Sequence, residues 1–340
     1  MTHLTYLEAA VVGLIQGITE LFPISSLGHN VLLPALIGGS WGTDLNVAKP
    51  ESPYLAYIVG LHVATAIALL IYFWRDWVRI IKGFFASIGH VIAPTEGTSR
   101  WQLQTADQRL AWLIIVATIP VGLVGLKFEH EFRVLFGKPI RAAIFLVING
   151  LILLAGEFFR RKASVEADRQ IAQERELVPV GGARPPGTAK HAAGHQAERA
   201  AEYTLAIESD RRLSTQGYLS AFLIGTAQIL ALLAGISRDG VAMVAGMFRG
   251  LSREDAARFA FLLATPVILA AGVLKVPDLM GPLGNGIRGQ VLVGSVLSGV
   301  GAYLSVRFLV KYFRTRTLTP FAIYCIVVGL GSVIYLGFIK

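Results

Sequence analysis

Long apolar stretches alternate along this chain with short polar segments. Six of them reach or approach the roughly 20 residues that a helix needs to cross a bilayer, near 54–73, 110–126, 140–159, 256–274, 289–309 and 319–338. The pattern predicts an all-α integral membrane protein with six transmembrane helices, in which residues 1–340 form a single membrane domain.

Two further apolar stretches, 7–37 and 217–250, are interrupted in the middle by polar, helix-breaking residues. The first break reads PISSLGH and the second AGISRDG. The halves on either side are too short to span a bilayer comfortably. Irregular backbone is tolerated at membrane depth only where protein or a water-filled cavity provides hydrogen-bond partners for its N–H and C=O groups. We therefore predict two re-entrant helix hairpins.

The order of these elements predicts an inverted repeat. Each hairpin is followed by three spans, and because three is odd, the repeat 217–338 enters the membrane from the face opposite to the repeat 7–159. Such repeats are common in transporter-like folds. Aligning the two breaks places Ser25 on Ser237, and the hydrophilic stretch 160–216 joins the two repeats.

Charge supports a membrane location and predicts an orientation. Only 16% of the residues are charged, against about 25% in soluble domains. Of the 31 Lys and Arg residues, 22 fall in the loops near 75–109, 160–216, 249–258 and 307–316, on one side of the predicted topology, 8 fall on the other, and Arg238 is left within the membrane. The richer side should be cytoplasmic, with 160–216 as a flexible loop that is helical near 162–177. Because the basic residues flank apolar segments, no nucleic-acid partner is expected.

The first break carries polar residues of types that take part in catalysis. Gln16 and Glu20 are four apart and share a helix face. Ser25 is a good N-cap, which places Ser26 in the first turn of the next helix and His29 on the same side three residues later. Ionisable residues at membrane depth are costly and mark functional sites by default. The structural alternative is that Glu20 only hydrogen-bonds a neighbouring helix.

The second break predicts an anion site. Ser237 can cap the helix that follows, Gly240 helps the backbone to turn, and the planar fork of Arg238 suits phosphate oxygens. If the hairpins enter from opposite faces, two helix N-termini with free N–H groups meet near the midplane. The alternative, which is compatible with an anion site, is an ion pair of Arg238 with Asp239 or Glu20 that holds the repeats together.

At these residues the sequence resembles the undecaprenyl-diphosphatase family of bacterial membrane phosphatases, which is linked to bacitracin resistance. The resemblance covers nearly the whole chain, is sharpest in QGITELFPISSLGH, and continues in GISRDG, FAFLLATP and FAIY. The second motif departs from the family pattern Pro-Gly-x-Ser-Arg-Ser-Gly-x-Thr, because this chain has Ala234, Asp239 and Ala242 at three of its positions.

The resemblance implies hydrolysis of undecaprenyl diphosphate to undecaprenyl phosphate and inorganic phosphate, which recycles the lipid carrier of cell-wall synthesis. The reaction would take place at the outward side of the bacterial inner membrane with a divalent cation, Mg²⁺ or Ca²⁺. The implied catalytic residues are Glu20, Ser26, His29 and Arg238. Contacts to the diphosphate are implied for Gln16, Ser25, Ser237, Arg238 and Gly240, and a metal is expected at Glu20 and Asp239.

Several alternatives stay open. Ser26 or His29 could form a phosphoenzyme, or water could attack directly, while Glu20 could orient His29 or bind the metal. A lipid-phosphate transporter or flippase is the second function, and a non-hydrolytic homologue that keeps the polyprenyl-phosphate site is its variant. The expected partners are the polyprenyl diphosphate lipid and the bilayer, and a homodimer is compatible with the sequence. His62, inside 54–73, could face the cavity, although a hydrogen-bonded structural histidine is expected.

Overall fold

The structure is a computed structural model that describes residues 4–45, 53–93, 99–100, 102–136, 138–177, 195–281 and 284–339. Every regular element in these ranges is a helix. Their bounds are α1 Tyr6–Leu21, α2 Ser26–Ile37, α3 Gly39–Asp44, α4 Pro53–Tyr72, α5 Trp74–Ile92, α6 Ala106–Phe136, α7 Pro139–Leu177, α8 His195–Ser214, α9 Tyr218–Ala227, the 3₁₀ helix η1 Gln228–Leu232, α10 Arg238–Phe248, α11 Arg253–Met280, α12 Arg288–Thr315, α13 Thr319–Ile334 and the π-helical turn η3 Tyr335–Ile339.

The six predicted spans correspond to six of these helices, α4, α6, α7, α11, α12 and α13. All except α4 contain a stretch that is long and apolar enough to cross a membrane. The 20 residues of α4 make a helix about 30 Å long, which matches the thickness of the hydrocarbon core. The prediction of an all-α membrane protein is therefore confirmed.

Both interrupted stretches are helix–break–helix units. Phe22 ends α1 in an extended conformation, and Pro23 follows it before α2 begins at Ser26. In the second unit, α9 tightens into η1 before an extended segment leads to α10. The breaks fall at the predicted positions, whereas the re-entrant path of the two pairs through the membrane stays a prediction.

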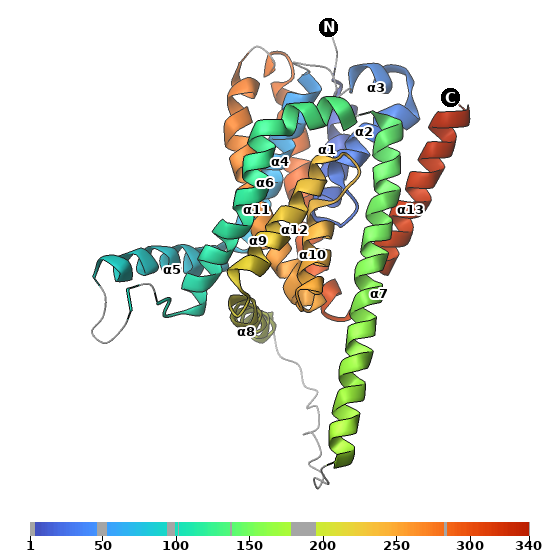
Figure 1. Ribbon diagram of the computed structural model, residues 1–340. Helices are drawn as coiled ribbons and strands as arrows, with labels where there is room; N and C mark the ends of the chain where they lie inside the picture. Colours follow the sequence, from blue (N-terminus) through green and yellow to red (C-terminus); the bar gives the residue numbers. More distant parts are fainter. Residues whose placement is uncertain are drawn as a thin grey trace.

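The two halves of the chain pack closely against each other (Figure 1). Helix α1 lies along α12, and α9 lies along α6. A Cβ atom at Gly17 would meet the main chain of Ser298, and one at Gly225 would meet the main chain of Ala117, so only glycine allows these approaches. In an inverted repeat α9 corresponds to α1 and α6 to α12, so each contact is the counterpart of the other. The boundaries of the two repeats stay a prediction.

Two polar segments that were expected to be loops are largely helical. The expectation is wrong within 75–109, where α5 forms and is bent by 83° from α4. It is also wrong for much of 160–216. Helix α7 runs on to Leu177, which agrees with the helical portion expected near 162–177, and α8 forms beyond it. Residues 178–194 of this stretch lie outside the described part of the chain.

A network of ion pairs joins α5, α6, α8 and α11 at the end of the bundle opposite to the two termini (Figure 1). Arg79 contacts Asp76, Asp107 and Asp210 at 2.9, 2.8 and 2.5 Å. Arg258 contacts Asp76 at 2.9 Å and Asp210 at 2.7 Å. The side chain of Asp210 is only 1% exposed, so these pairs satisfy carboxylates that would be costly to bury alone.

Candidate active site

The carboxylate of Glu20 connects both breaks with a neighbouring helix. Its Oε2 accepts hydrogen bonds from Gln16 Nε2 at 2.8 Å and from Ser26 Oγ at 2.5 Å, and lies 3.3 Å from His62 Nε2. Its Oε1 accepts a hydrogen bond from Arg238 Nη2 at 3.0 Å. The ion pair between Glu20 and Arg238 that was considered for the two repeats is therefore present, and it lies beside the hydroxyl of Ser26.

The two predicted caps are formed and they approach each other. Ser25 Oγ accepts a hydrogen bond from Gly28 N in its own helix and another from Gly235 N in the second break, both at 3.2 Å. Ser237 Oγ caps α10 by accepting from Gly240 N at 3.1 Å. Ser25 has φ 69°, the only positive φ of a non-glycine residue in the described ranges. Ser25 therefore connects the two motifs, because its hydroxyl accepts hydrogen bonds from both while its backbone is held in a strained conformation.

Asn149 on α7 is a site residue that the sequence analysis missed. Its Nδ2 donates to Pro23 O in the first break, and its Oδ1 accepts from Ser237 N in the second, both at 2.9 Å. The side chain is fully buried and also contacts Cys325 Sγ at 3.4 Å. A single asparagine in an apolar span, far in sequence from both motifs, carries no local signal of this role.

The structure separates His29 from the carboxylate. The Nδ1 atom of His29 lies 2.7 Å from Ser25 O, and its Nε2 atom lies 2.8 Å from the hydroxyl of Tyr324 on α13. Among the described residues no hydrogen bond joins His29 to Ser26 or Glu20, so the contacts do not favour the alternative in which Glu20 orients His29. Tyr324 was not named as a candidate, although it ends the FAIY segment that carries part of the family resemblance.

His62 takes the place beside the carboxylate. Its Nδ1 lies 2.8 Å from Ile58 O within α4, which fixes the ring, and its Nε2 lies 3.2 Å from Gln16 Nε2 as well as 3.3 Å from Glu20 Oε2. His62 is hydrogen-bonded, as expected, and its place beside Glu20 also agrees with the alternative that it faces the polar site. The Oε1 atom of Gln16 accepts from Asn30 Nδ2 at 2.5 Å, which extends the network to α2.

The two expected metal ligands differ in how fully they are paired. Both oxygens of Glu20 have protein partners. Asp239 is 1% exposed, its Oδ1 lies 3.3 Å from Arg238 Nε, and its Oδ2 has no hydrogen-bond partner among the described residues. In those residues no three His, Cys, Asp or Glu side chains are grouped as a metal site. Of these two carboxylates, only Asp239 has an unpaired oxygen to offer a cation.

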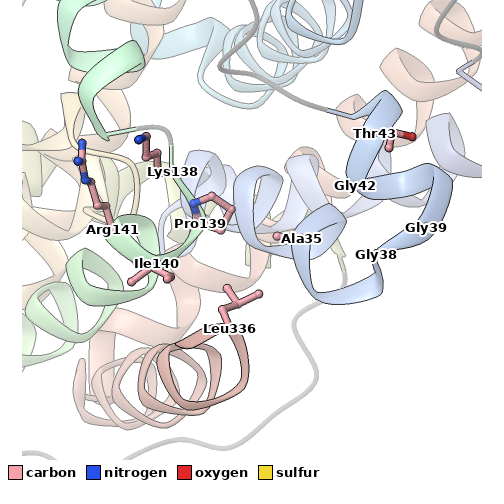
Figure 2. Close-up of a pocket in the computed structure, with 10 residues that line it drawn as sticks. All are labelled: Ala35, Gly38, Gly39, Gly42, Thr43, Lys138, Pro139, Ile140, Arg141 and Leu336. Atoms are coloured by element: carbon pink, nitrogen blue, oxygen red, sulfur yellow. The ribbon is translucent and has the colours of Figure 1, made fainter. Parts of the chain in front are cut away.

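A separate groove of about 740 Å³ opens at the far end of α2. Figure 2 shows it between the α2–α3 turn, the start of α7 and the last turn of the chain, with Lys138 and Arg141 on one side. Ala35 lines it, nine residues beyond Ser26 on the same helix, which is about 13 Å along the axis. The groove is lined by Ala35, Gly38, Gly39, Gly42, Thr43, Lys138, Pro139, Ile140, Arg141 and Leu336, so none of the predicted site residues belongs to it.

Comparison with known proteins finds relatives that match nearly the whole chain. The chain is 56% identical over 335 residues to the undecaprenyl-diphosphatase of Mycolicibacterium paratuberculosis, with 98% of each chain covered. It is 54% identical to undecaprenyl-diphosphatase 2 of Frankia alni, with 97% of each covered, and 38% identical to undecaprenyl-diphosphatase of Granulibacter bethesdensis, with 98% and 97% covered. The family model described as bacitracin resistance protein BacA matches residues 9–331. The chain therefore belongs to the bacitracin resistance protein BacA family.

Proposed function

We propose that this membrane protein hydrolyses undecaprenyl diphosphate to undecaprenyl phosphate and inorganic phosphate. The names of its relatives support this substrate. The observation that carries the proposal is the hydrogen bond of 2.5 Å between Ser26 Oγ and Glu20 Oε2. It joins a hydroxyl in the first turn of a helix to a carboxylate whose other oxygen binds Arg238.

Ser26 is the proposed nucleophile. Its Oγ forms a bond to the terminal phosphorus while the bond from that phosphorus to the bridging oxygen breaks, and undecaprenyl phosphate leaves. Glu20 takes the proton of the hydroxyl, as an adjacent base does for other activated nucleophiles. Water then attacks the phosphoserine, inorganic phosphate leaves, and the hydroxyl of Ser26 is restored.

Positive groups around Ser26 suit the charge that develops on the phosphoryl oxygens. Arg238 uses Nη2 for Glu20 and Nε for a long contact to Asp239, and no described residue accepts a hydrogen bond from its Nη1. That side of the guanidinium fork is available to phosphate oxygens. The N-termini of α2 and α10 add backbone N–H groups and dipole ends of the same sign.

His29 is the weaker nucleophile candidate because both of its ring nitrogens are engaged, one by a backbone carbonyl and one by Tyr324. It lies about one turn beyond Ser26 on α2. From there it is suited to pass a proton to or from the water that attacks the phosphoserine. In this proposal Tyr324 holds the imidazole in position and His62 does the same for the carboxylate of Glu20.

A divalent cation fits this site only in part. Asp239 Oδ2 is buried without a partner, and Mg²⁺ is commonly held by one or two carboxylates together with substrate phosphate oxygens. Asp239 is therefore the proposed protein ligand, and Glu20 is not. When bound, the cation would neutralise negative charge on the diphosphate beside Arg238.

The proposed location is the bacterial inner membrane, with the site open to the outer side. Support comes from the Lys and Arg residues, which favour the side of α5 and α8 as the cytoplasmic one. The two chain termini lie at the opposite end of the bundle (Figure 1). A homodimer stays a prediction.

Phosphate release from undecaprenyl diphosphate by the purified protein tests the function. We expect kcat to fall by at least about 10³-fold in each of Ser26→Ala, Glu20→Gln and Arg238→Lys. These changes remove the proposed nucleophile, its base and the bidentate phosphate-binding group, which act together. Ser332→Ala is the matched control, since Ser332 is a buried serine on α13 with no part in the site. It should keep wild-type activity, both with Mg²⁺ and with Ca²⁺.

The same assay separates hydrolysis from its alternatives. If the wild type released no phosphate and the double change Asp239→Ser with Ala242→Thr restored release, the chain would be a non-hydrolytic homologue. Movement of a lipid phosphate across liposome membranes without hydrolysis would favour the flippase. The flippase is the second candidate because α1 packs on α12 and α9 on α6, as expected for the inverted repeats of transporter-like folds. Trapping of a phosphate on Ser26 after acid quenching would support the proposed nucleophile over direct attack by water.

A further inference from the structure

The face of α5 that points away from the bundle is apolar. Large side chains recur every three or four residues along it and all are exposed, with Phe85 at 64% and Ile92 at 75%. At 100° per residue they fall within a stripe about 80° wide. The stripe consists of Trp74, Val78, Ile81, Phe85, Ile88 and Ile92. A continuous apolar surface of this kind marks a contact with lipid or with another protein.

The opposite face of α5 is already used to hold the helix on the bundle. A Cβ atom at Gly83 would lie 2.8 Å from the main chain of Asp107, so α5 and α6 approach closely there. Ser87 Oγ accepts a hydrogen bond from Trp112 Nε1 at 3.0 Å. The exposed stripe is therefore a second apolar face on a helix whose first face is packed.

A basic edge borders the stripe. Arg75 and Lys82 are seven residues apart, which places them on one flank of the helix, and both are exposed. Arg75 lies over the rings of Trp74 and Tyr203. Lys82 has no ion pair within the described part of the chain. The flank thus offers positive charge next to the apolar stripe.

The direction of α5 fits the plane of a membrane. The helix is bent by 83° from α4, and Figure 1 shows it leaving the bundle sideways at the end opposite to the two termini. The exposed Ile67 and Ile71 of α4 lead directly into Trp74. The stripe therefore continues the lipid-facing surface of a membrane-spanning helix after a turn of nearly a right angle.

We propose that α5 lies in the bilayer interface, with the apolar stripe in the acyl region and Arg75 and Lys82 among the headgroups of anionic phospholipids. An amphipathic helix with aromatic and aliphatic residues on one face and basic residues beside them takes this position. Asp76 of α5 binds Arg258 of α11 at 2.9 Å, so the interfacial helix is fastened to the bundle. The proposal is independent of the catalytic one.

Nitroxide labels on two adjacent residues test this position in nanodiscs that contain phosphatidylglycerol. Phe85→Cys places the label in the stripe, and the matched Ala86→Cys places it about 100° away, on the exposed basic flank. Cys325, the single cysteine, is buried and should react far more slowly than the two exposed positions. Position 85 is expected to show a several-fold higher ratio of oxygen to aqueous-nickel accessibility than position 86.

Two outcomes would overturn the proposal. Equal nickel accessibility at positions 85 and 86 would place α5 in water. Protection of position 85 from both reagents, with dipolar coupling between labels of two molecules, would show that a second copy of the chain covers the stripe.

The lipid class is tested with the same label at position 85. Immersion is expected to decrease when phosphatidylcholine replaces phosphatidylglycerol. Arg75→Gln with Lys82→Gln should make the two lipids equivalent. If the lipids are already equivalent with both basic residues present, the assignment of anionic headgroups is wrong.

Discussion

At the scale of single residues, the site depends on side chains that hold backbone groups as much as on those proposed to react. Asn149 and Ser25 each form hydrogen bonds with both breaks. Both side chains are buried, so a lost hydrogen-bond partner is hard to replace and each such contact has a larger effect than it would have at an exposed surface.

Asn149→Leu keeps the approximate volume of the side chain but removes both hydrogen bonds. The amide of Ser237 would be left unpaired, at a cost of about 1–3 kcal/mol, and the carbonyl of Pro23 would keep only the weak contact with Cys325 Sγ. We expect a lower melting temperature in detergent together with a marked loss of kcat. Asn285→Leu, at an exposed position, should change neither quantity, and an unaltered melting temperature for Asn149→Leu would contradict the bridging role.

Tyr324→Phe removes only the hydroxyl that contacts His29 and keeps the ring, whose centroid lies 5.7 Å from that of His29. A hydrogen bond of this kind contributes about 0.5–1.5 kcal/mol. We therefore expect kcat to fall by up to about tenfold, while KM stays unchanged and the melting temperature falls only slightly. Tyr303→Phe on α12 is the control, and identical kinetics for both variants would show that Tyr324 does not position His29.

At the scale of elements, glycines decide how closely the two halves pack. A Cβ atom at Gly17 would lie 2.9 Å from the carbonyl carbon of Ser298, so Gly17→Ala must push α1 away from α12. Overpacking of this type costs about 1–3 kcal/mol, and because α1 carries Glu20, activity should fall with stability. Thermal denaturation with Gly122→Ala, a position with no neighbouring atom within 4 Å, provides the comparison that should show no change.

The elements that could be predicted from the sequence are those with a strong local signal. The six spans follow from their apolar length, and the two breaks from Pro23 and from the polar run around Ser237. Helix α5 was missed because its two apolar faces are separated by charged residues, and charge was taken as the sign of a loop. Its spacing of three and four residues was the signal that could have identified it.

Site geometry was predictable only where the partners are near in sequence. Gln16 and Glu20 share a helix face, and Ser25 and Ser237 cap the helices that follow them, as expected. The places of His62, Asn149 and Tyr324 depend on how α4, α7 and α13 pack around the breaks. Such long-range contacts have no local pattern, and for this reason contact of Glu20 with His29 was kept as an alternative, whereas its contact with His62 was not foreseen.

At the scale of the whole molecule, the ion-pair network at the far end of the bundle fixes α8 and α5 to the spans. Arg258→Leu would leave Asp76 and Asp210 short of a partner in a buried setting, and removing one member of a buried pair typically costs about 3–5 kcal/mol. We expect strong destabilisation and poor membrane expression.

The exposed Arg211→Leu on α8 is the matched control for Arg258→Leu, because it removes the same charge without touching the network. Double-mutant cycles of Arg258 with Asp210 would measure the coupling directly. A melting temperature equal to that of the wild type would show that α8 is held by other contacts.

The single cysteine has a consequence for following the protein at work. Cys325 is completely buried, with Sγ beside Asn149 and near the carbonyl of Pro23, so it lies at the junction of both breaks. A membrane-permeant thiol reagent can reach it only when that junction opens. The rate at which the thiol is modified in the otherwise unaltered chain would therefore report how often the junction opens. If the diphosphate closes the junction, saturation with substrate should lower this rate.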